Sequence, residues 1–177
     1  MCIRDRYCGN YFSYDIGYDY KIYTKNDSLY LHDGEHDDAV LIPIGLHEFR
    51  KMYGNNRTTI RFGEEKGQKA MFYRYGQRPP TTLLEFTPAD YSEDQLNQFV
   101  GRYQSKEVNV IYKLKVDNNV LQVFLDDKMI VAYNPLAEDL FNSDHDGYLR
   151  FERGQNNEIK EFTITDYFLG SLSFYKL

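Results

Sequence analysis

The chain has 177 residues and a net charge of −6, with 42% hydrophobic and 16% aromatic residues. This composition supports a packed core and excludes a disordered or low-complexity chain, and the 17 Tyr and 12 Phe favour β-strands. The acidic balance would repel a phosphate backbone, so nucleic-acid binding is not expected. No apolar stretch reaches the length that spans a bilayer.

The first six residues, 1–6, are predicted to be a non-native leader. They lack the apolar core of a secretory signal, and they resemble the translation of sequencing-adapter DNA. Native sequence would then begin near Tyr7, which leaves room for a longer natural polypeptide. Cys2 would be spurious, and Cys8 alone forms neither an internal disulfide nor a metal site.

An internal repeat is the clearest pattern in the chain. The segment 7–13 resembles 99–105 at an offset of 92 residues, and the offset holds as far as Phe49 and Phe141. It then falls to 89, which indicates a three-residue deletion in a loop of the second copy. Matching pairs include Gly9 and Gly101, Tyr11 and Tyr103, Asn26 and Asn118, Pro43 and Pro135, and Arg61-Phe62 and Arg150-Phe151.

Each copy is predicted to form antiparallel strands joined by tight turns. Residues 20–24 and 112–116 alternate in the manner of half-buried strands. Each is followed by a turn rich in Asn and Asp, which tolerate the positive φ of a hairpin, and then by a second strand. The predicted pairs of strands are 20–24 and 29–31 in the first copy, and 112–116 and 121–125 in the second.

One short helix is predicted between the copies. Ser92 and Gln95 form a capping box, and Leu96 and Phe99 lie on one face of the helix, which we expect to plug one end of the second barrel. The breaker 76–80 precedes the last strand of copy one. We place the boundary near Thr87-Pro88, giving copies over 7–87 and 88–177, with closing strands over 82–86 and 171–175.

The second copy carries an ordered series of motifs. They are a short helix, an apolar-Gly-x-Tyr-x-Ser start (Val100 to Ser105), an Asp/Asn hairpin, Pro135-Leu136 with Phe141, an Arg-Phe strand (Leu149 to Arg153) and closing strands 159–164 and 172–177. In this order they resemble the lipocalin-like domain C-terminal to serine hydrolases of the β-lactamase and penicillin-binding type. The resemblance implies an all-β fold of two tandem small antiparallel lipocalin-like β-barrels, joined by a linker with one short helix.

The resemblance also implies that the chemistry belongs to a separate, preceding catalytic domain. That domain would carry a Ser-x-x-Lys nucleophile on a helix, a Tyr-x-Asn element and a Lys-Thr-Gly-like strand. Here Ser-x-x-Lys occurs only at Ser173 to Lys176, in a predicted strand where residues three apart face opposite sides. Tyr53-Gly54-Asn55 falls in a polar turn. We therefore assign no catalytic residue and no cofactor to this chain.

Two loops have metal-like composition. His32 to Asp38 combines two His with four carboxylates, and Asn142 to Gly147 imitates the first half of a calcium loop, whose twelfth position falls on Arg153 instead of Glu. A solvated polar loop explains both better, and we assign no metal ligand. The four His (His32, His36, His47 and His145) form no nucleophile–base pattern, and the charged turn 63–67 would repel phosphate.

The start of copy one is crowded with aromatic residues. Alternation sends about half of them into the core, and the others would serve an interface. The cluster comprises Tyr11, Phe12, Tyr14, Tyr18, Tyr20 and Tyr23, with Tyr167-Phe168 as a second candidate in copy two.

Three functions follow. The first is a non-catalytic accessory region of a β-lactamase-like serine hydrolase, packing on a catalytic domain in the same natural polypeptide to shape substrate access or assembly. Its location would be the bacterial periplasm, cell envelope or medium. The second is a free-standing module that binds a small apolar ligand or a protein. The third, an independent hydrolase, is the least favoured.

Overall fold

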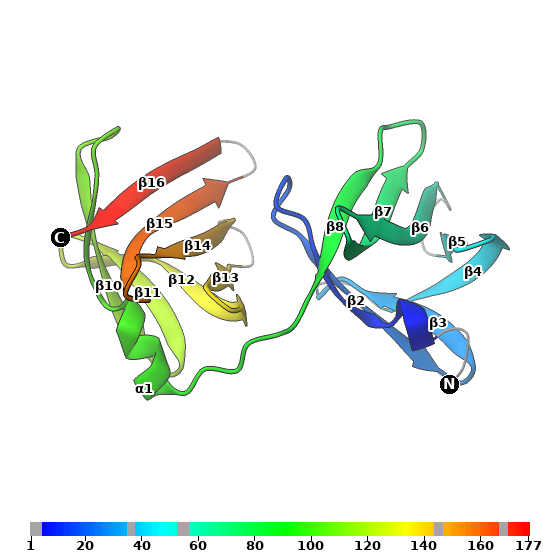
Figure 1. The fold of residues 1–177 in the computed structure, drawn as a ribbon, viewed down its shortest axis with the longest axis horizontal. Coiled ribbons are helices and arrows are strands. Elements are labelled where there is room, and N and C mark those ends of the chain that lie inside the picture. The colour runs from blue at the N-terminus through cyan, green and yellow to red at the C-terminus, as the bar shows by residue number, and fades with distance from the viewer. Residues whose placement is uncertain (1–4, 35–37, 53–56, 144–146, 167–169) are drawn as a thin grey trace. The chain divides into compact units, whose positions relative to one another are not determined.

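The structure is a computed structural model that describes residues 5–34, 38–52, 57–143, 147–166 and 170–177. The chain divides into two compact units, one up to Thr87 and one from Pro88 onward. Each unit is a closed antiparallel barrel of eight strands, which confirms the predicted all-β fold and its tandem arrangement (Figure 1).

The first barrel is a simple up-and-down circuit in which each strand pairs with the next. It closes where β1 pairs with β8, with Asn10 opposite Phe86. The strands are β1 (Gly9–Phe12), β2 (Asp19–Lys25), β3 (Ser28–His32), β4 (Ala39–Gly45), β5 (Glu48–Met52), β6 (Thr58–Glu65), β7 (Gln68–Tyr75) and β8 (Thr81–Phe86). A short 3₁₀ helix, η1 (Asp5–Tyr7), leads into β1 and buries Tyr7.

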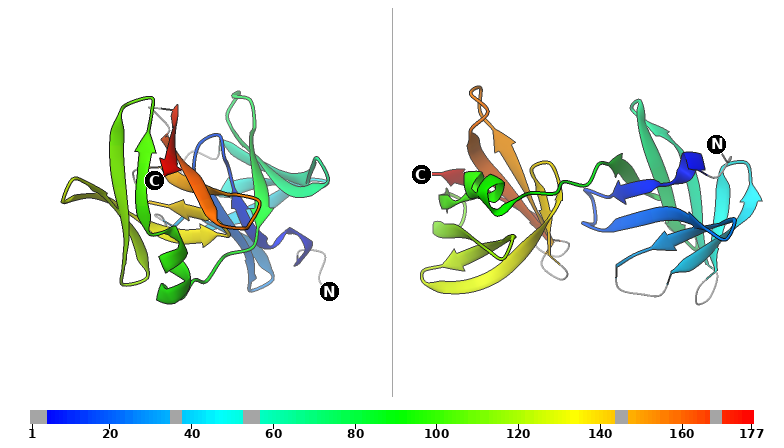
Figure 2. Two further views of the ribbon diagram at one scale, coloured as in Figure 1. Left: turned by 60° about the vertical axis from the view of Figure 1, so that its left-hand side comes forward. Right: turned by 90° about the horizontal axis from the view of Figure 1, so that it is seen from below.

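The second barrel repeats this circuit and closes where β9 pairs with β16, with Tyr103 opposite Lys176. Its strands are β9 (Gly101–Ser105), β10 (Val110–Asp117), β11 (Val120–Leu125), β12 (Lys128–Ala137), β13 (Leu140–Asn142), β14 (Tyr148–Arg153), β15 (Ile159–Asp166) and β16 (Gly170–Lys176). The helices α1 (Glu93–Leu96) and η2 (Asn97–Phe99) precede β9 (Figure 2).

The strands end where the sequence provides turn residues. Asn26 and Asp27, and likewise Asn118 and Asn119, have positive φ angles between 48° and 61°. Both residues of such a two-residue turn need positive φ to match the twist of the strands, and Asn and Asp tolerate it. The predicted turn over 63–67 was too long, because β6 continues through Glu65 and only Lys66 and Gly67 turn.

Matching positions of the two barrels share geometry as well as sequence. A bulge interrupts the pairing between Pro43 and Gly45, and another does so between Pro135 and Ala137. The next turn places His47 at φ 59° and Asp139 at φ 57°. The carbonyl of each accepts a backbone hydrogen bond from the Phe of the Arg-Phe strand, at 2.9 Å and 2.8 Å. The repeat therefore extends to backbone irregularities.

The repeated Gly has a packing reason. A Cβ on Gly101 would lie 3.1 Å from Lys176 Cε, and a Cβ on Gly9 would collide with the Glu85 carboxylate. Gly at the start of the first strand thus leaves room for the long side chain at the end of the last strand, where the barrel closes.

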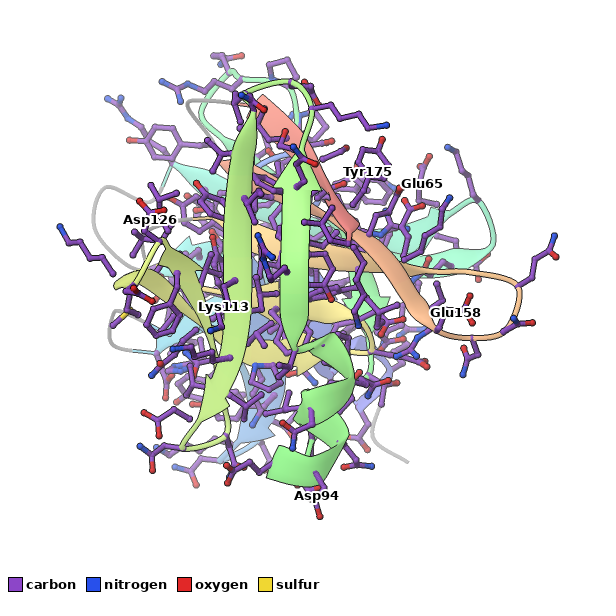
Figure 3. All side chains as sticks on the ribbon, turned by 90° about the vertical axis from the view of Figure 1, so that its left-hand side faces the viewer. Glu65, Asp94, Lys113, Asp126, Glu158 and Tyr175 are labelled. Carbon is purple, nitrogen blue, oxygen red and sulfur yellow. The ribbon has the colours of Figure 1, made fainter. Side chains whose placement is uncertain are left out.

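The helix α1 begins as predicted at a capping box. The Gln95 N–H donates to Ser92 Oγ at 3.3 Å, and the Ser92 N–H donates to Gln95 Oε1 at 2.9 Å. Leu96 and Phe99 are fully buried in the core of the second barrel, so this segment closes one end of it. Asp94 points away from the barrel, and Lys113 lies on the exposed side of β10 (Figure 3). Among the described residues, no helix has the length and hydropathy needed to cross a membrane.

Candidate interaction surface

Side chains from its own strands fill the interior of each barrel. The first core contains Tyr11, Ile22, Leu29, Leu31, Leu41, Phe49, Ile60, Phe62, Met71 and Leu83. The second contains Tyr103, Leu114, Leu121, Val123, Tyr133, Phe141, Leu149, Phe151, Phe162 and Phe174. An eight-strand barrel has an interior just wide enough to be filled in this way. These residues occupy the space that a ligand would take in a hollow barrel.

The two core tyrosines bridge each barrel to the segment that plugs it. Tyr11 Oη donates to the Tyr7 carbonyl at 2.8 Å, and Tyr103 Oη donates to the Phe99 carbonyl at 2.9 Å. Burial raises the pKa of both hydroxyls above their usual range, and the Glu85 carboxylate adds to the rise at Tyr11. Both groups are thus structural donors that stay protonated well into alkaline solution.

The two residues of the Ser-x-x-Lys pattern do not meet. Both lie in β16, where Ser173 faces away from the buried Phe174. Lys176 reaches the opposite side and donates from Nζ to the Gln98 carbonyl at 3.2 Å. Burial lowers the pKa of the Lys176 ammonium. The lysine therefore anchors the plug segment and cannot activate this serine.

The described part of the acidic loop forms a small exposed hydrogen-bonded group. His32 Nδ1 lies 2.9 Å from Asp38 Oδ1, and the Tyr23 hydroxyl donates to the other oxygen of this carboxylate. These bonds, that with Tyr23 first, lower the pKa of Asp38, while the Tyr23 pKa rises to about 12. No cluster of three or more His, Cys, Asp or Glu placed to hold a metal occurs within the described ranges.

Arg153, at the twelfth position of the calcium-like loop, has a structural role. Its guanidinium makes a bidentate pair with Asp139, at 2.7 Å and 2.6 Å, and donates to Gln98 Oε1 at 2.8 Å. The bonds with Asp139 raise the pKa of Arg153 further. The arginine thereby ties η2 to the barrel.

Several predicted features lie outside the described residues, namely His36, Tyr53-Gly54-Asn55, His145 and Tyr167-Phe168.

The aromatic cluster of the first copy divides between core and surface. Tyr11 and Phe12 are buried, and Tyr20 packs against the core and stacks on Tyr73, with ring centroids 5.3 Å apart. Tyr14 and Tyr18 are exposed large aromatics.

A second exposed apolar group lies on β4 and in the turn after it. Ile42 and Ile44 are each 43% exposed, and Leu46 is 84% exposed. They flank Pro43 at the bulge, on the outside of the closed wall. We call Ile44, Gly45 and Leu46 the bulge rim of the first barrel. Single exposed apolar side chains are common, but a run of them beside a backbone irregularity indicates a contact surface.

The matching rim of the second barrel is covered in part by the chain itself, since Leu136 and Ala137 are half-buried while Glu138 is exposed. At the 92-residue offset, Leu136 and Ala137 correspond to Ile44 and Gly45. Ala137 forms a β-bridge with Pro88, and the Leu136 carbonyl accepts a hydrogen bond from the Ala89 N–H at 3.2 Å. The linker thus adds a short extended segment to this rim.

Tyr91 completes this cover. Its ring stacks on Phe141, with centroids 5.9 Å and planes 9° apart, and meets Phe99 edge-on at 5.6 Å. Its hydroxyl oxygen accepts a hydrogen bond from the Asp139 N–H at 3.1 Å. Burial raises the Tyr91 pKa. Residues 88–91 therefore bind the rim through backbone and aromatic contacts together.

A shallow cavity of about 200 Å³ lies on the outer wall of the first barrel, beside the bulge rim, because its lining residue Glu48 pairs with Gly45. Arg61 stacks 4.3 Å above the Phe72 ring, while Arg74 donates to Thr59 Oγ1 at 3.3 Å. The Glu48 carboxylate lies 3.9 Å from Arg74 and offsets part of the positive charge. The lining residues are already engaged with one another, so this cavity is a weaker candidate than the bulge rim.

The bulge rim was missed in the sequence. The signal was present as Ile42-Pro43-Ile44-Gly45-Leu46, an apolar run too long for strict alternation and interrupted by Pro and Gly.

No family model matches this chain, and no curated protein matches it.

Proposed function

We propose that the chain is a non-catalytic accessory region of a β-lactamase-like serine hydrolase of the bacterial periplasm, envelope or medium. Its two barrels, lipocalin-like in this proposal, pack on a catalytic domain of the same natural polypeptide. There they shape substrate access or assembly. The motif series of the second copy suggests this family.

One observation carries the packing role. The bulge rim of the first barrel exposes Ile44 and Leu46, whereas at the matching rim of the second barrel the chain covers Leu136 and Ala137 and leaves Glu138 exposed. Burying apolar surface stabilises a contact by roughly 25 cal/mol per Å² removed from water. An exposed apolar rim of this kind favours cover by further polypeptide of the natural protein over bulk solvent.

The filled interiors support the accessory role over ligand storage. Tyr11 and Tyr103 are fully buried in their cores, with their hydroxyls bonded to the plug segments. A ligand would have to displace several large side chains at once. If native mass spectrometry detected a lipid that co-purifies with the chain, this reasoning would be wrong and the binding-module hypothesis would replace it.

The first test is the reading frame upstream of the codon for Tyr7. An open frame that encodes a domain with a helix-borne Ser-x-x-Lys would support the proposal. A start codon directly upstream, or one separated from Tyr7 only by a signal peptide, would refute it.

The second test uses the enzyme found upstream. We would compare kcat/KM and oligomeric state of the full polypeptide with those of a chain that ends before the first barrel. A variant without the nucleophilic Ser provides the blank. An accessory role predicts an altered KM or assembly with the catalytic machinery intact, and identical values would contradict it.

A further inference from the structure

We infer that the bulge rim of the first barrel is the docking site of the polypeptide segment that immediately precedes that barrel. The segment would bind as residues 88–91 bind the second barrel. This inference deepens the proposed function and rests on it in one respect, since it assumes that native polypeptide precedes the first barrel.

The second barrel supplies the template. There the cover consists of a β-bridge from Pro88 to Ala137, a backbone hydrogen bond from Ala89 to Leu136, and the Tyr91 ring on Phe141. The covering segment continues through α1 and η2 into the first strand, so its path is set by the segment that plugs the barrel.

The first barrel repeats the backbone features that receive these contacts in the second. The bulge, the left-handed turn residue and its hydrogen bond to the Arg-Phe strand are the same in both barrels. Tyr7 occupies the plug position of Phe99 and is buried, although Asp5 and Arg6 of η1 belong to the predicted leader. Tyr7 stacks on Phe62 at 4.8 Å and bonds His47 Nδ1 through its hydroxyl at 2.8 Å.

At the 92-residue offset, the counterparts of residues 88–91 fall ahead of Met1, while that of Leu96 is Arg4. Phe49, the counterpart of Phe141, is 7% exposed, where Phe141 is fully buried. The rim is also more apolar than its counterpart, since Leu46 replaces Glu138.

The occupant is therefore defined chemically. It is an extended segment that adds to the bulge through its backbone, places an aromatic ring on Phe49, and ends in a helical turn with an apolar residue. In the second copy the aromatic residue stands eight positions before Phe99 and the apolar residue three positions before it, at Tyr91 and Leu96. The natural polypeptide should carry the same types eight and three positions before Tyr7.

The direct test is a chain in which a copy of residues 87–96 replaces Met1 to Arg4, so that the copied Leu is joined to Asp5 by the peptide bond. We expect hydrogen exchange at the His47 amide to slow at least tenfold, because the template gives the matching Asp139 amide a bond to the Tyr91 hydroxyl. Thermal unfolding of the first barrel should shift upward. A graft with Ala in place of the copied Tyr should lose most of this protection.

Ile44 and Ile42 provide the matched pair, since both are 43% exposed on the same strand. Ile44→Asp should abolish the gain from the graft, while Ile42→Asp, at the position of the exposed Asn134, should leave it intact. Equal effects, or no slowing at His47, would overturn the docking inference.

The upstream sequence separates this inference from the proposed function. A hydrolase domain upstream without the aromatic and apolar residues would preserve the accessory role and refute the docking mode. Conversely, the aromatic and apolar residues could follow directly after a start codon, with no hydrolase domain upstream, and the graft could still protect His47. That result would support the docking mode and refute the accessory role.

Discussion

Replacing Tyr103 with Phe tests the bond that joins the second barrel to its plug. The side chain is fully buried and its hydroxyl donates to the Phe99 carbonyl at 2.9 Å. Phe keeps the ring but lacks the hydroxyl. One buried hydrogen bond is therefore lost, and the Phe99 carbonyl is left without this donor in an apolar core. Such a change destabilises by about 1–2 kcal/mol, a roughly 5- to 30-fold change in the folded-to-unfolded ratio.

Hydrogen exchange with mass spectrometry measures this loss, because peptides from each barrel report on that barrel alone. Tyr103→Phe should accelerate exchange in β9, β10 and β16 and leave the first barrel unchanged. Tyr11→Phe should do the opposite, since its bond to Tyr7 is equivalent. Tyr175→Phe, at a position 40% exposed, is the control and should stay within about 0.5 kcal/mol of the parent. A loss of that small size at Tyr103, or equal loss in both barrels, would refute the reasoning.

Three further predictions concern ion pairing, pH and turn geometry. Arg153→Met should destabilise the second barrel by about 1–3 kcal/mol, because it leaves the half-buried Asp139 without its arginine partner. Chemical denaturation, together with hydrogen exchange measured at the amides of η2, checks this. Above pH 10 the unfolded Tyr103 ionises while the buried one remains protonated, so stability should fall by up to about 1.4 kcal/mol per pH unit; Tyr103→Phe should remove that share of the slope in denaturant titrations. Asn119 has φ 61°, so Asn119→Val should lower the thermal stability by about 1–2 kcal/mol and Asn119→Gly should leave it nearly unchanged.

Local chemistry made most of the fold predictable. Alternation placed Leu114 inside and Lys113 outside, the Asn-Asn and Asn-Asp pairs marked the hairpins, and Ser92 marked the start of the helix. These signals depend on a few neighbouring residues. Because the sequence repeats, each element could be compared with its counterpart in the other copy, which is why two tandem antiparallel barrels could be predicted.

The contact surface was harder to predict. Ile42 and Ile44 are exposed strand residues, and Ile44 is the residue without a register partner at the bulge, an irregularity that becomes visible only once β4 pairs with β5. The role of Arg153 was equally hidden, because Asp139 and Gln98 come together only when the plug folds onto the barrel. Such contacts form only when residues far apart in the sequence come together in the folded barrel, and the local propensity of each segment does not reveal them.

Closure of the first strand on the last has a consequence for how such units can be combined. With an even number of alternating strands, the chain enters and leaves each barrel at the same end, as the pairing of Asn10 with Phe86 requires. A neighbouring module can then be added before or after a barrel without rebuilding its opposite end. The turn at Asp126 and Asp127, at that opposite end, would be a suitable position for an inserted tag or epitope (Figure 3). A duplicated unit of this design is therefore a component that gene fusion can append repeatedly.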